Sequence, residues 1–360
     1  MKKIISGIVA LVLAVSTTIT AFASVPKNTV VSEANGAAEY VLAEFKKNGV
    51  EEFTIDNSRD FYVFLKAGID MSKFEKTYVN SVKERLDETK GELNSMNLFA
   101  NSILCLNSLG YDVENFNGYN LVELFEKTDA TKPDDDNPYY YKDALEAVSV
   151  VGADEKFVNT LADSLVSCYT MGKGLDYWGF SSDNTAVFVT GLLSYKGSND
   201  YSKYIEDAFN VLSSYKVDGG YFSNADYGTE PNADSTALVL MAYSKAGNIE
   251  KADETYELLG NFKGSATGIY TYGGKDSAFA TKDALTGFGY YLPLLKEDEK
   301  PTQKPTEKPT QKPENKPTDE NSEQGKDDSL VSPDTGAVSF GVAAFVGSAS
   351  LLAILKKKEK

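Results

Sequence analysis

Three acidic residues in the second half of the chain are the strongest candidates for chemistry. Asp183 lies in the string SSDNTA, Asp234 lies in the similar string ADSTA, and Glu230 comes shortly before Asp234. Two carboxylates that face one site can cleave a glycosidic bond, so Glu230 paired with Asp183 or Asp234 would suit a polysaccharide hydrolase or lyase. Both aspartates also stand at expected helix starts, and the simpler alternative is that they are helix N-caps.

Aromatic residues gather in three glycine-rich turns that precede late helix starts, GLDYWGF, DGGYFSNADYG and GIYTYGG. Rings with a polar edge suit the face of an apolar or sugar-like ligand, and the alternative is that they pack the turns onto the helices. Trp178 is the only tryptophan and the first residue to mutate. The predicted ligand-binding residues are Tyr177, Trp178, Phe180, Tyr221, Phe222, Tyr270 and Tyr272, with Tyr227 in the same turns.

Metal chemistry has little support in the composition. The chain has no histidine, and its two cysteines, Cys105 and Cys168, lie in apolar helical contexts, which favours two buried thiols over a disulfide. The acidic segment 134–137 could offer oxygen ligands to calcium. It lacks the glycine and distal glutamate of an EF-hand loop, so we favour a solvated acidic loop and expect no metal site.

An internal repeat positions these residues. Apolar stretches end at glycines spaced 42, 42, 45 and 50 residues apart, and a sixth stretch ends at Pro293. Glycine supplies the left-handed residue that ends a helix. The glycines are Gly68, Gly110, Gly152, Gly197 and Gly247.

Each of the five glycines is followed by a second helical pattern with a polar face, as in 69–86, 111–128 and 153–168. An apolar inner helix followed by an amphipathic outer helix is typical of a helical-hairpin repeat. Six hairpins predict an all-α fold, an (α/α)6 toroid, with an open superhelix as the alternative.

The glycine-aromatic turns followed by an Asp-Ser/Thr-Ala helix start resemble the prenyltransferase-like, or squalene cyclase-like, toroid repeats over roughly residues 50–295. The resemblance implies a fold that serves enzymes and binding proteins alike, including cobalamin carriers. A corrinoid is therefore one candidate ligand. The sequence predicts no other cofactor.

The catalytic sets of that family are incomplete here. The zinc prenyltransferases hold their metal with Asp, Cys and His, and this chain has no histidine. The cyclases use DxDDTA, and SSDNTA keeps Asp183 and the Thr-Ala pair but has Ser181 and Asn184 in place of two acids. The Cys-Gly-Glu-Gln string of thioester domains is absent from the sequence. These departures favour a binding protein over an enzyme.

The N-terminal end is typical of a secretory signal peptide. Lys2 and Lys3 precede a short apolar run and Ala21-Phe22-Ala23, which predicts a signal peptide at 1–23 with cleavage after Ala23. A membrane anchor is the alternative, but the run is short for a span.

The C-terminal end resembles the cell-wall sorting signal of sortase substrates. SPDTG at 332–336 matches the usual LPxTG at Pro333, Thr335 and Gly336, and an apolar segment 337–355 and a basic tail follow. The resemblance implies that a sortase attacks the carbonyl of Thr335 and passes the acyl group to a peptidoglycan precursor. A single-span anchor is the alternative.

A proline-rich stretch at 300–331 separates this signal from the body. Proline at every fourth residue favours an extended, disordered spacer that can cross a wall. The body, 24–299, has the length of one domain, and the net charge of −17 disfavours nucleic acid as a partner.

We therefore expect a secreted protein on the wall of a Gram-positive-type bacterium, with membrane contact only before sorting. Its partners would be sortase, peptidoglycan and an extracellular ligand (a small molecule, a glycan or a protein) bound at the aromatic rim. A carboxylate-based or cyclase-like enzyme and a purely structural spacer domain are the alternatives.

Overall fold

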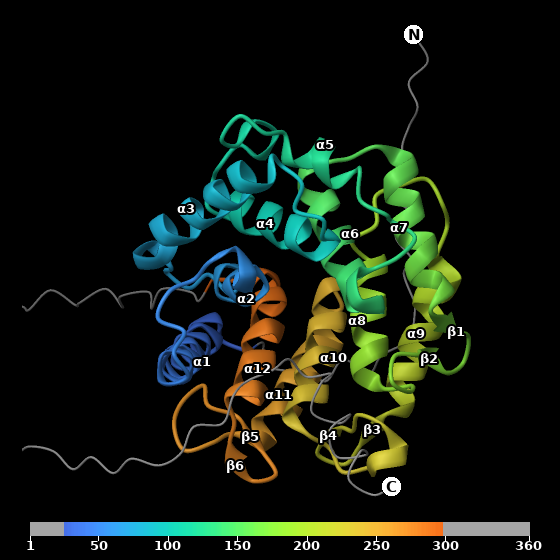
Figure 1. The fold of residues 1–360 in the computed structure, drawn as a ribbon. Coiled ribbons are helices and arrows are strands. Elements are labelled where there is room, and N and C mark those ends of the chain that lie inside the picture. Colours follow the sequence, from blue (N-terminus) through green and yellow to red (C-terminus); the bar gives the residue numbers. More distant parts are fainter. Residues whose placement is uncertain (1–24, 298–360) are drawn as a thin grey trace, which may run out of the picture.

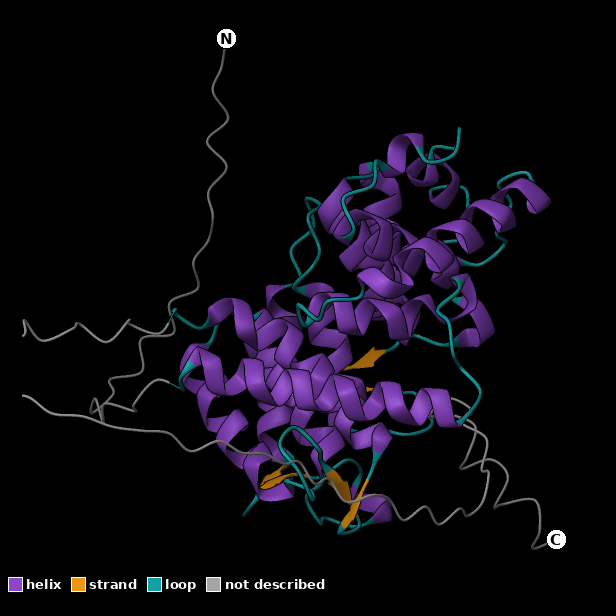
Figure 2. Ribbon diagram, turned by 90° about the vertical axis from the view of Figure 1, so that its left-hand side faces the viewer, coloured by secondary structure: helices purple, strands orange, loops and turns teal. Residues whose placement is uncertain are grey.

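The computed structural model describes residues 25–297, and this part is helical apart from three two-stranded hairpins (Figures 1 and 2). The predicted signal peptide, proline-rich spacer and sorting signal lie outside the described residues. No helix within 25–297 has the length and apolar character needed to cross a membrane. The α-helices are α1 Lys27–Lys47, α2 Ser58–Lys66, α3 Ser72–Thr89, α4 Met96–Ser108, α5 Leu121–Phe125, α6 Tyr139–Val151, α7 Glu155–Ser167, α8 Ser182–Leu192, α9 Ser202–Ser214, α10 Ala233–Lys245, α11 Ile249–Leu259 and α12 Ala278–Tyr291.

Six of these helices form the interior, and we call α2, α4, α6, α8, α10 and α12 the inner helices. Each packs against the next in chain order, and α12 packs against α2 (Figure 1). Almost every residue of α8 and α10 is buried, as expected for helices that are apolar all round. The remaining helices lie outside this closed series of neighbours, with α7, α9 and α11 each packed on the inner helix before it.

Helix α1 covers α12 from outside and was not anticipated from the repeat pattern. Its buried side includes Val30, Ala34 and Val41, and its Glu33 accepts a hydrogen bond from the hydroxyl of Tyr270 at 2.8 Å. Since the chain has no outer helix after α12 among the described residues, the first helix takes that place. The N-terminal and C-terminal ends of the described chain therefore meet, and Lys27 pairs with Glu297 at 2.5 Å.

Four of the five predicted helix-ending glycines have the expected backbone. Gly68, Gly110, Gly152 and Gly247 have φ between 69° and 83°, the region that glycine enters without a steric penalty. The prediction for Gly197 is wrong. Helix α8 ends earlier, at Leu192, and a turn-rich segment separates its end from α9.

The predicted outer helix at 111–128 is also wrong. A 3-10 turn at Val113–Asn115 and a bridge between Phe116 and Tyr119 replace most of it, leaving only the five-residue α5. Asn117 and Gly118 both have positive φ, which an Asn-Gly pair favours and which a helix cannot contain.

Three hairpins precede α8, α10 and α12. Their strands are antiparallel pairs, β1 Tyr169–Thr170 with β2 Gly174–Leu175, β3 Lys216–Val217 with β4 Gly220–Tyr221, and β5 Thr271–Tyr272 with β6 Lys275–Asp276. In the last two, a threonine of the following helix fixes the hairpin. The Oγ1 of Thr236 accepts from the backbone N–H of Tyr221 at 3.0 Å, and Thr281 accepts from that of Tyr270 at 2.9 Å. This bond explains the threonine in the repeated helix start.

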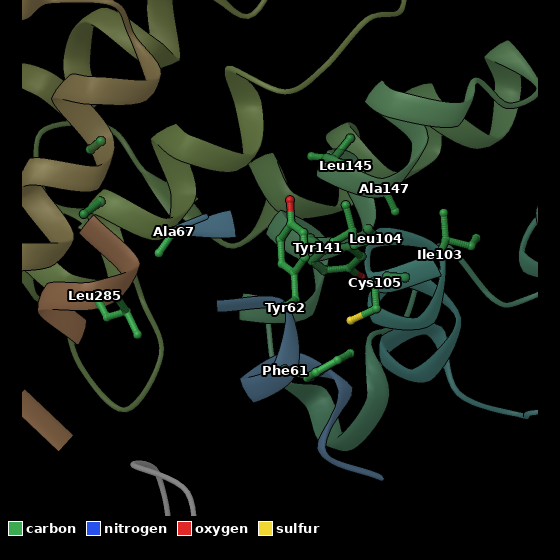
Figure 3. Close-up of a cluster of buried hydrophobic side chains, with 14 of the residues drawn as sticks. Phe61, Tyr62, Ala67, Ile103, Leu104, Cys105, Tyr141, Leu145, Ala147 and Leu285 are labelled. Carbon is green, nitrogen blue, oxygen red and sulfur yellow. The ribbon is translucent and has the colours of Figure 1, made fainter. Parts of the chain in front are cut away.

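Both cysteines are thiols, as expected, although only Cys105 is fully buried and Cys168 is half-buried. Cys105 lies near Phe61, Leu104 and Tyr141 in the main core (Figure 3). Burial raises the pKa of its thiol above the usual range, so it stays protonated.

A buried carboxylate connects inner helices that are not neighbours in the series. Glu146 of α6 accepts from the Tyr62 hydroxyl at 3.1 Å and from Lys66 Nζ at 2.8 Å, both on α2. It also accepts from the Tyr290 hydroxyl of α12 and lies 3.5 Å from Lys142 Nζ. Burial alone would raise the pKa of Glu146, but Lys142 and Lys66 outweigh it and lower that pKa well below its usual value.

We predict that Glu146→Gln lowers the free energy of unfolding at pH 7 by about 3 kcal/mol, because it removes a buried carboxylate that is the ion-pair partner of Lys66 and one of the two partners of Lys142. The folded-state pKa of Glu146 is the lower one, so its contribution is present above the unfolded-state value of about 4.3 and is lost as pH falls. Urea unfolding followed by far-UV circular dichroism should therefore show a smaller difference from the wild type at pH 3.5.

The matched control is Glu88→Gln, which removes the same charge from an exposed position. An equal loss in both variants, or a Glu146→Gln loss that stays constant with pH, would contradict this role.

Candidate functional site

The starts of α8 and α10 carry Asp183 and Asp234 at the second helical residue, and neither aspartate is the N-cap. The caps are Ser181, whose Oγ accepts from the amide of Asn184 at 3.0 Å, and Asn232, whose Oδ1 accepts from the amide of Ser235 at 2.9 Å. The capping alternative is therefore wrong for both aspartates. Their side chains are left for other contacts.

Asp183 and Asp234 form a group with Asp283 of α12, and we call these three residues the aspartate group. Asp234 is only 6% exposed, and its Oδ1 is buried without a hydrogen-bond partner. Desolvation, followed by the charges of Asp283 and Asp183, raises the pKa of Asp234 to about 9. Burial raises the pKa of Asp283 to about 7, with Lys282 opposing and Asp183 assisting. Both carboxyls thus hold protons at a pH where an ordinary aspartate is ionised.

Cations near the group are engaged with other carboxylates. Lys282 Nζ lies 2.8 Å from Asp60 Oδ1, and Arg59 Nε lies 3.2 Å from Asp143 Oδ2. None of the ion pairs within residues 25–297 includes a member of the aspartate group. Asp183 instead accepts from the hydroxyls of Ser223 at 2.7 Å and Ser182 at 3.1 Å. The group therefore keeps an excess of carboxyl oxygens over donors.

Trp178 stands at the tip of a tight turn beside this group. It is 71% exposed, yet its backbone has φ of 56°, an uncommon conformation for a bulky residue. Asp176 and Phe180 form a bridge that closes the turn, and the Gly179 amide donates to Asp176 Oδ1 at 3.2 Å. A strained backbone with a large apolar side chain in solvent is a recurrent feature of binding sites.

Asn184 joins the Trp178 turn to the inner helices. Its Nδ2 donates to the carbonyls of Tyr177 at 2.9 Å and Gly179 at 2.8 Å, and its Oδ1 accepts from the Tyr139 hydroxyl at 2.6 Å. An aspartate at 184 could not donate these bonds, so the departure from the cyclase string has a structural reason.

Three aromatic rings lead from the surface toward the aspartates. Trp178 contacts Tyr177 with ring centroids 6.0 Å apart, and Tyr177 contacts Tyr139 of α6 at 5.7 Å. Burial, followed by the charge of Asp183, raises the pKa of the Tyr139 hydroxyl. We call Trp178, Tyr177 and Tyr139 the aromatic path.

The other predicted rim residues separate into buried and exposed sets. Tyr221 and Tyr270 are 1% exposed and Phe222 is 8% exposed, so these three rings pack the hairpins onto the helices and have almost no surface for a ligand. Burial thus corrects the prediction for these residues. Tyr272 and Tyr227 are exposed, and Phe180 is half-buried with Lys173 over its ring at 5.6 Å.

Glu230 does not join the aspartates. It is exposed in the loop before α10, and the carboxylates that most affect Asp234 are Asp283 and Asp183. The predicted pairing of Glu230 with Asp183 or Asp234 is therefore wrong, and the grouping of Asp183, Asp234 and Asp283 was not predicted.

Asp283, Arg59 and Tyr139 were missed as site residues. One signal for Asp283 was available, because the string Lys-Asp-Ala-Leu occurs in α6 at 142–145 and again in α12 at 282–285. A polar pair that recurs within two apolar inner helices indicates a position facing the centre of the fold. Tyr139 had no such signal, since its role depends on the turn held by Asn184.

Within the acidic segment 134–137, Asp134 has a structural role, whereas Asp136 is exposed as expected of a solvated loop. Asp134 Oδ2 accepts from the Ser95 hydroxyl at 2.7 Å and the Asn97 amide at 2.8 Å, next to the N-cap of α4. Within residues 25–297, no cluster of three or more His, Cys, Asp or Glu side chains has an arrangement that could hold a metal ion. A surface groove of about 320 Å³ lies at the other end of α2, beside Lys66 and Pro293.

No protein-family model matches this chain, and no curated protein matches it.

Proposed function

We propose that this protein is exported, is joined to the cell wall through Thr335, and displays an (α/α)6 toroid that binds an extracellular ligand at the Trp178 turn. The order of signal peptide, body, proline-rich spacer and SPDTG signal in the sequence supports export and wall attachment. These segments lie outside the described residues.

The closed series of inner helices supports the toroid. Contacts run from α2 through α12 and back to α2, and α1 supplies the outer helix for α12. Six hairpins of this kind, with glycine-aromatic turns before the last three inner helices, suit a prenyltransferase-like or squalene cyclase-like repeat protein.

The observation that carries the binding proposal is Trp178, a large apolar side chain held in solvent on a strained and fully hydrogen-bonded turn. Because the Trp178 ring is not buried in the core, its apolar surface can be buried against a ligand, which stabilises the complex. A glycan, a planar small molecule such as a corrinoid, or an aromatic-rich protein surface would suit it.

We predict that Trp178→Ala weakens binding at least tenfold for a hit from a panel of peptidoglycan fragments, plant and wall glycans, and corrinoids, since one exposed aromatic anchor often dominates a small interface. The melting temperature should stay within about 2 °C of the wild type, because an exposed side chain adds little to stability. Isothermal titration calorimetry measures the affinity.

Ile249→Ala is the control, an exposed apolar residue just beyond the opposite end of α10. If Trp178→Ala unfolds the protein, the residue is structural. If no ligand in the panel depends on Trp178, the body is better explained as a spacer domain.

Wall attachment is tested by Thr335→Ala in a Gram-positive host. The wild type should be released with peptidoglycan fragments by a wall-digesting enzyme, whereas Thr335→Ala should stay with the membrane fraction because it lacks the threonine side chain by which the sorting motif is recognised. Thr318→Ala, in the spacer, should behave as the wild type. A variant at Thr335 that is still linked to peptidoglycan would disprove the assignment.

The aspartate group favours a second candidate, acid-assisted cleavage or cyclisation. Asp234 and Asp283, with pKa values of about 9 and about 7, hold protons that a general acid can donate near neutral pH. Asp183 lies close enough to influence both pKa values and could serve as the second carboxylate.

If this candidate holds, turnover of a wall or plant polysaccharide should fall at least 100-fold in both Asp183→Asn and Asp234→Asn, the range typical for removal of a general acid. Glu230→Gln is the matched control and should keep full activity, because its carboxylate is exposed in a loop. Reducing-end assays with all three variants measure this. Turnover that survives in both aspartate variants would exclude the enzyme.

A further inference from the structure

The Oδ1 atom of Asp234 is buried and has no hydrogen-bond partner. A buried carboxyl oxygen without a donor costs free energy, and native structures rarely leave one without a reason. No hydrogen bond within residues 25–297 satisfies this oxygen, and the aspartate group itself contains no cation.

Charged and titratable side chains from several inner helices surround Asp234 and Asp283. The charged and titratable groups near Asp234 and Asp283 are Asp183 from α8, Lys282 from α12, Arg59 and Asp60 from α2, and Tyr139 from α6. The two cations are each within 3.2 Å of a carboxylate outside the group. The aspartate group therefore lacks a cation of its own that could donate hydrogen bonds to it.

Part of the site is exposed at the surface. Asp183, Asp283 and Tyr139 are only half-buried, and the aromatic path continues from Tyr139 to the exposed Trp178. Aromatic faces attract a cation that approaches them, and Arg59 already lies 6.0 Å from the centre of the Tyr139 ring. The chain's net charge of −17 favours a cationic ligand over an anionic one.

We propose that the aspartate group binds the primary ammonium of a ligand whose body lies along the aromatic path. A primary ammonium has three N–H donors, enough to reach Asp234 Oδ1 and a second carboxylate, whereas a quaternary ammonium has none. This assignment names the ligand class for the binding role proposed above and depends on that role for the aromatic half of the site.

Binding of the ammonium is coupled to proton release. The empty site keeps protons on Asp234 and Asp283, and the bound cation favours the ionised carboxylates. Affinity for a cation therefore rises with pH as long as the ligand amine remains protonated. A neutral ligand that accepts from protonated carboxyls would show the opposite trend.

The probes are benzylamine, benzyl alcohol and benzyltrimethylammonium, titrated calorimetrically into the full mature protein. We expect benzylamine to bind at least tenfold more tightly than either of the others. Its affinity should rise at least tenfold between pH 6 and pH 8, because at least one proton leaves the site. Two buffers of different ionisation enthalpy report the protons released.

Asp234→Asn should abolish both the amine preference and the pH dependence, and it should fold because a neutral amide replaces a carboxyl that is already neutral. Asp283→Asn provides a second variant. Asp226→Asn, an exposed carboxylate on the loop after β4, is the matched control and should bind as the wild type.

Equal binding of benzylamine and benzyl alcohol, wild-type affinity in folded Asp234→Asn, or affinity that falls with pH would overturn the proposal. Complete competition by an equal concentration of calcium chloride would also overturn it, in favour of a metal site. Amine binding that needs Asp234 but not Trp178 would support the ammonium site and contradict the binding role of Trp178. Binding that needs Trp178 but not Asp234 would support the role of Trp178 and contradict the ammonium site.

Discussion

The carboxylate of Glu146 connects helices that the repeat alone would leave apart. Neighbouring inner helices are held by ordinary apolar packing, but α6 contacts α2 and α12 across the centre of the series through this side chain. Replacing water around a buried carboxylate requires several donors with good geometry, and tyrosine hydroxyls and lysines from three helices supply them. The need to supply these donors to Glu146 fixes the relative position of α2, α6 and α12. The position of the aspartate group, toward the other ends of the inner helices, follows from it.

Charge is arranged along the inner helices in the sense that their dipoles favour. Asp183 and Asp234 lie in the first turns of α8 and α10, where amide groups favour negative charge. Lys66 and Lys245 lie at the last residues of α2 and α10, where carbonyl groups favour positive charge. A small apolar cluster of Val187, Met241 and Tyr290 joins α8, α10 and α12. Burial still raises the pKa of Asp234, so desolvation outweighs the dipole at that position.

The sequence predicted those features that depend on local chemistry. Glycine at the helix ends, apolar inner helices and the threonine of the repeated helix start each have a local signal, and the structure has most of them where expected. Features that depend on distant contacts were missed. Helix α1 has a modest apolar pattern of its own and makes sense only against α12, and the Asn117–Gly118 turn interrupts a helix that the hydrophobic spacing favoured.

In the candidate site, too, residues with a local sequence signal were predicted and residues that depend on distant contacts were missed. The strings around Asp183 and Asp234 placed two of the three aspartates, whereas burial of Tyr221 and Tyr270 and exposure of Trp178 depend on how each hairpin folds over its helix. A ring looks the same in sequence whether it points to the core or to solvent. Asp283 was visible only as a repeated Lys-Asp pair, which needs the inner face of the helices to be known first.

The meeting of the first and last described residues has a consequence for how the molecule is presented. Lys27 and Glu297 pair close to Pro293 and Lys66, at the end of the inner helices where the lysines lie. The Trp178 turn and the aspartates are at the opposite end. Attachment through the C-terminal side, as proposed above, would place the Trp178 turn and the aspartate group at the end of the body farthest from the attachment point, where an incoming molecule can approach them.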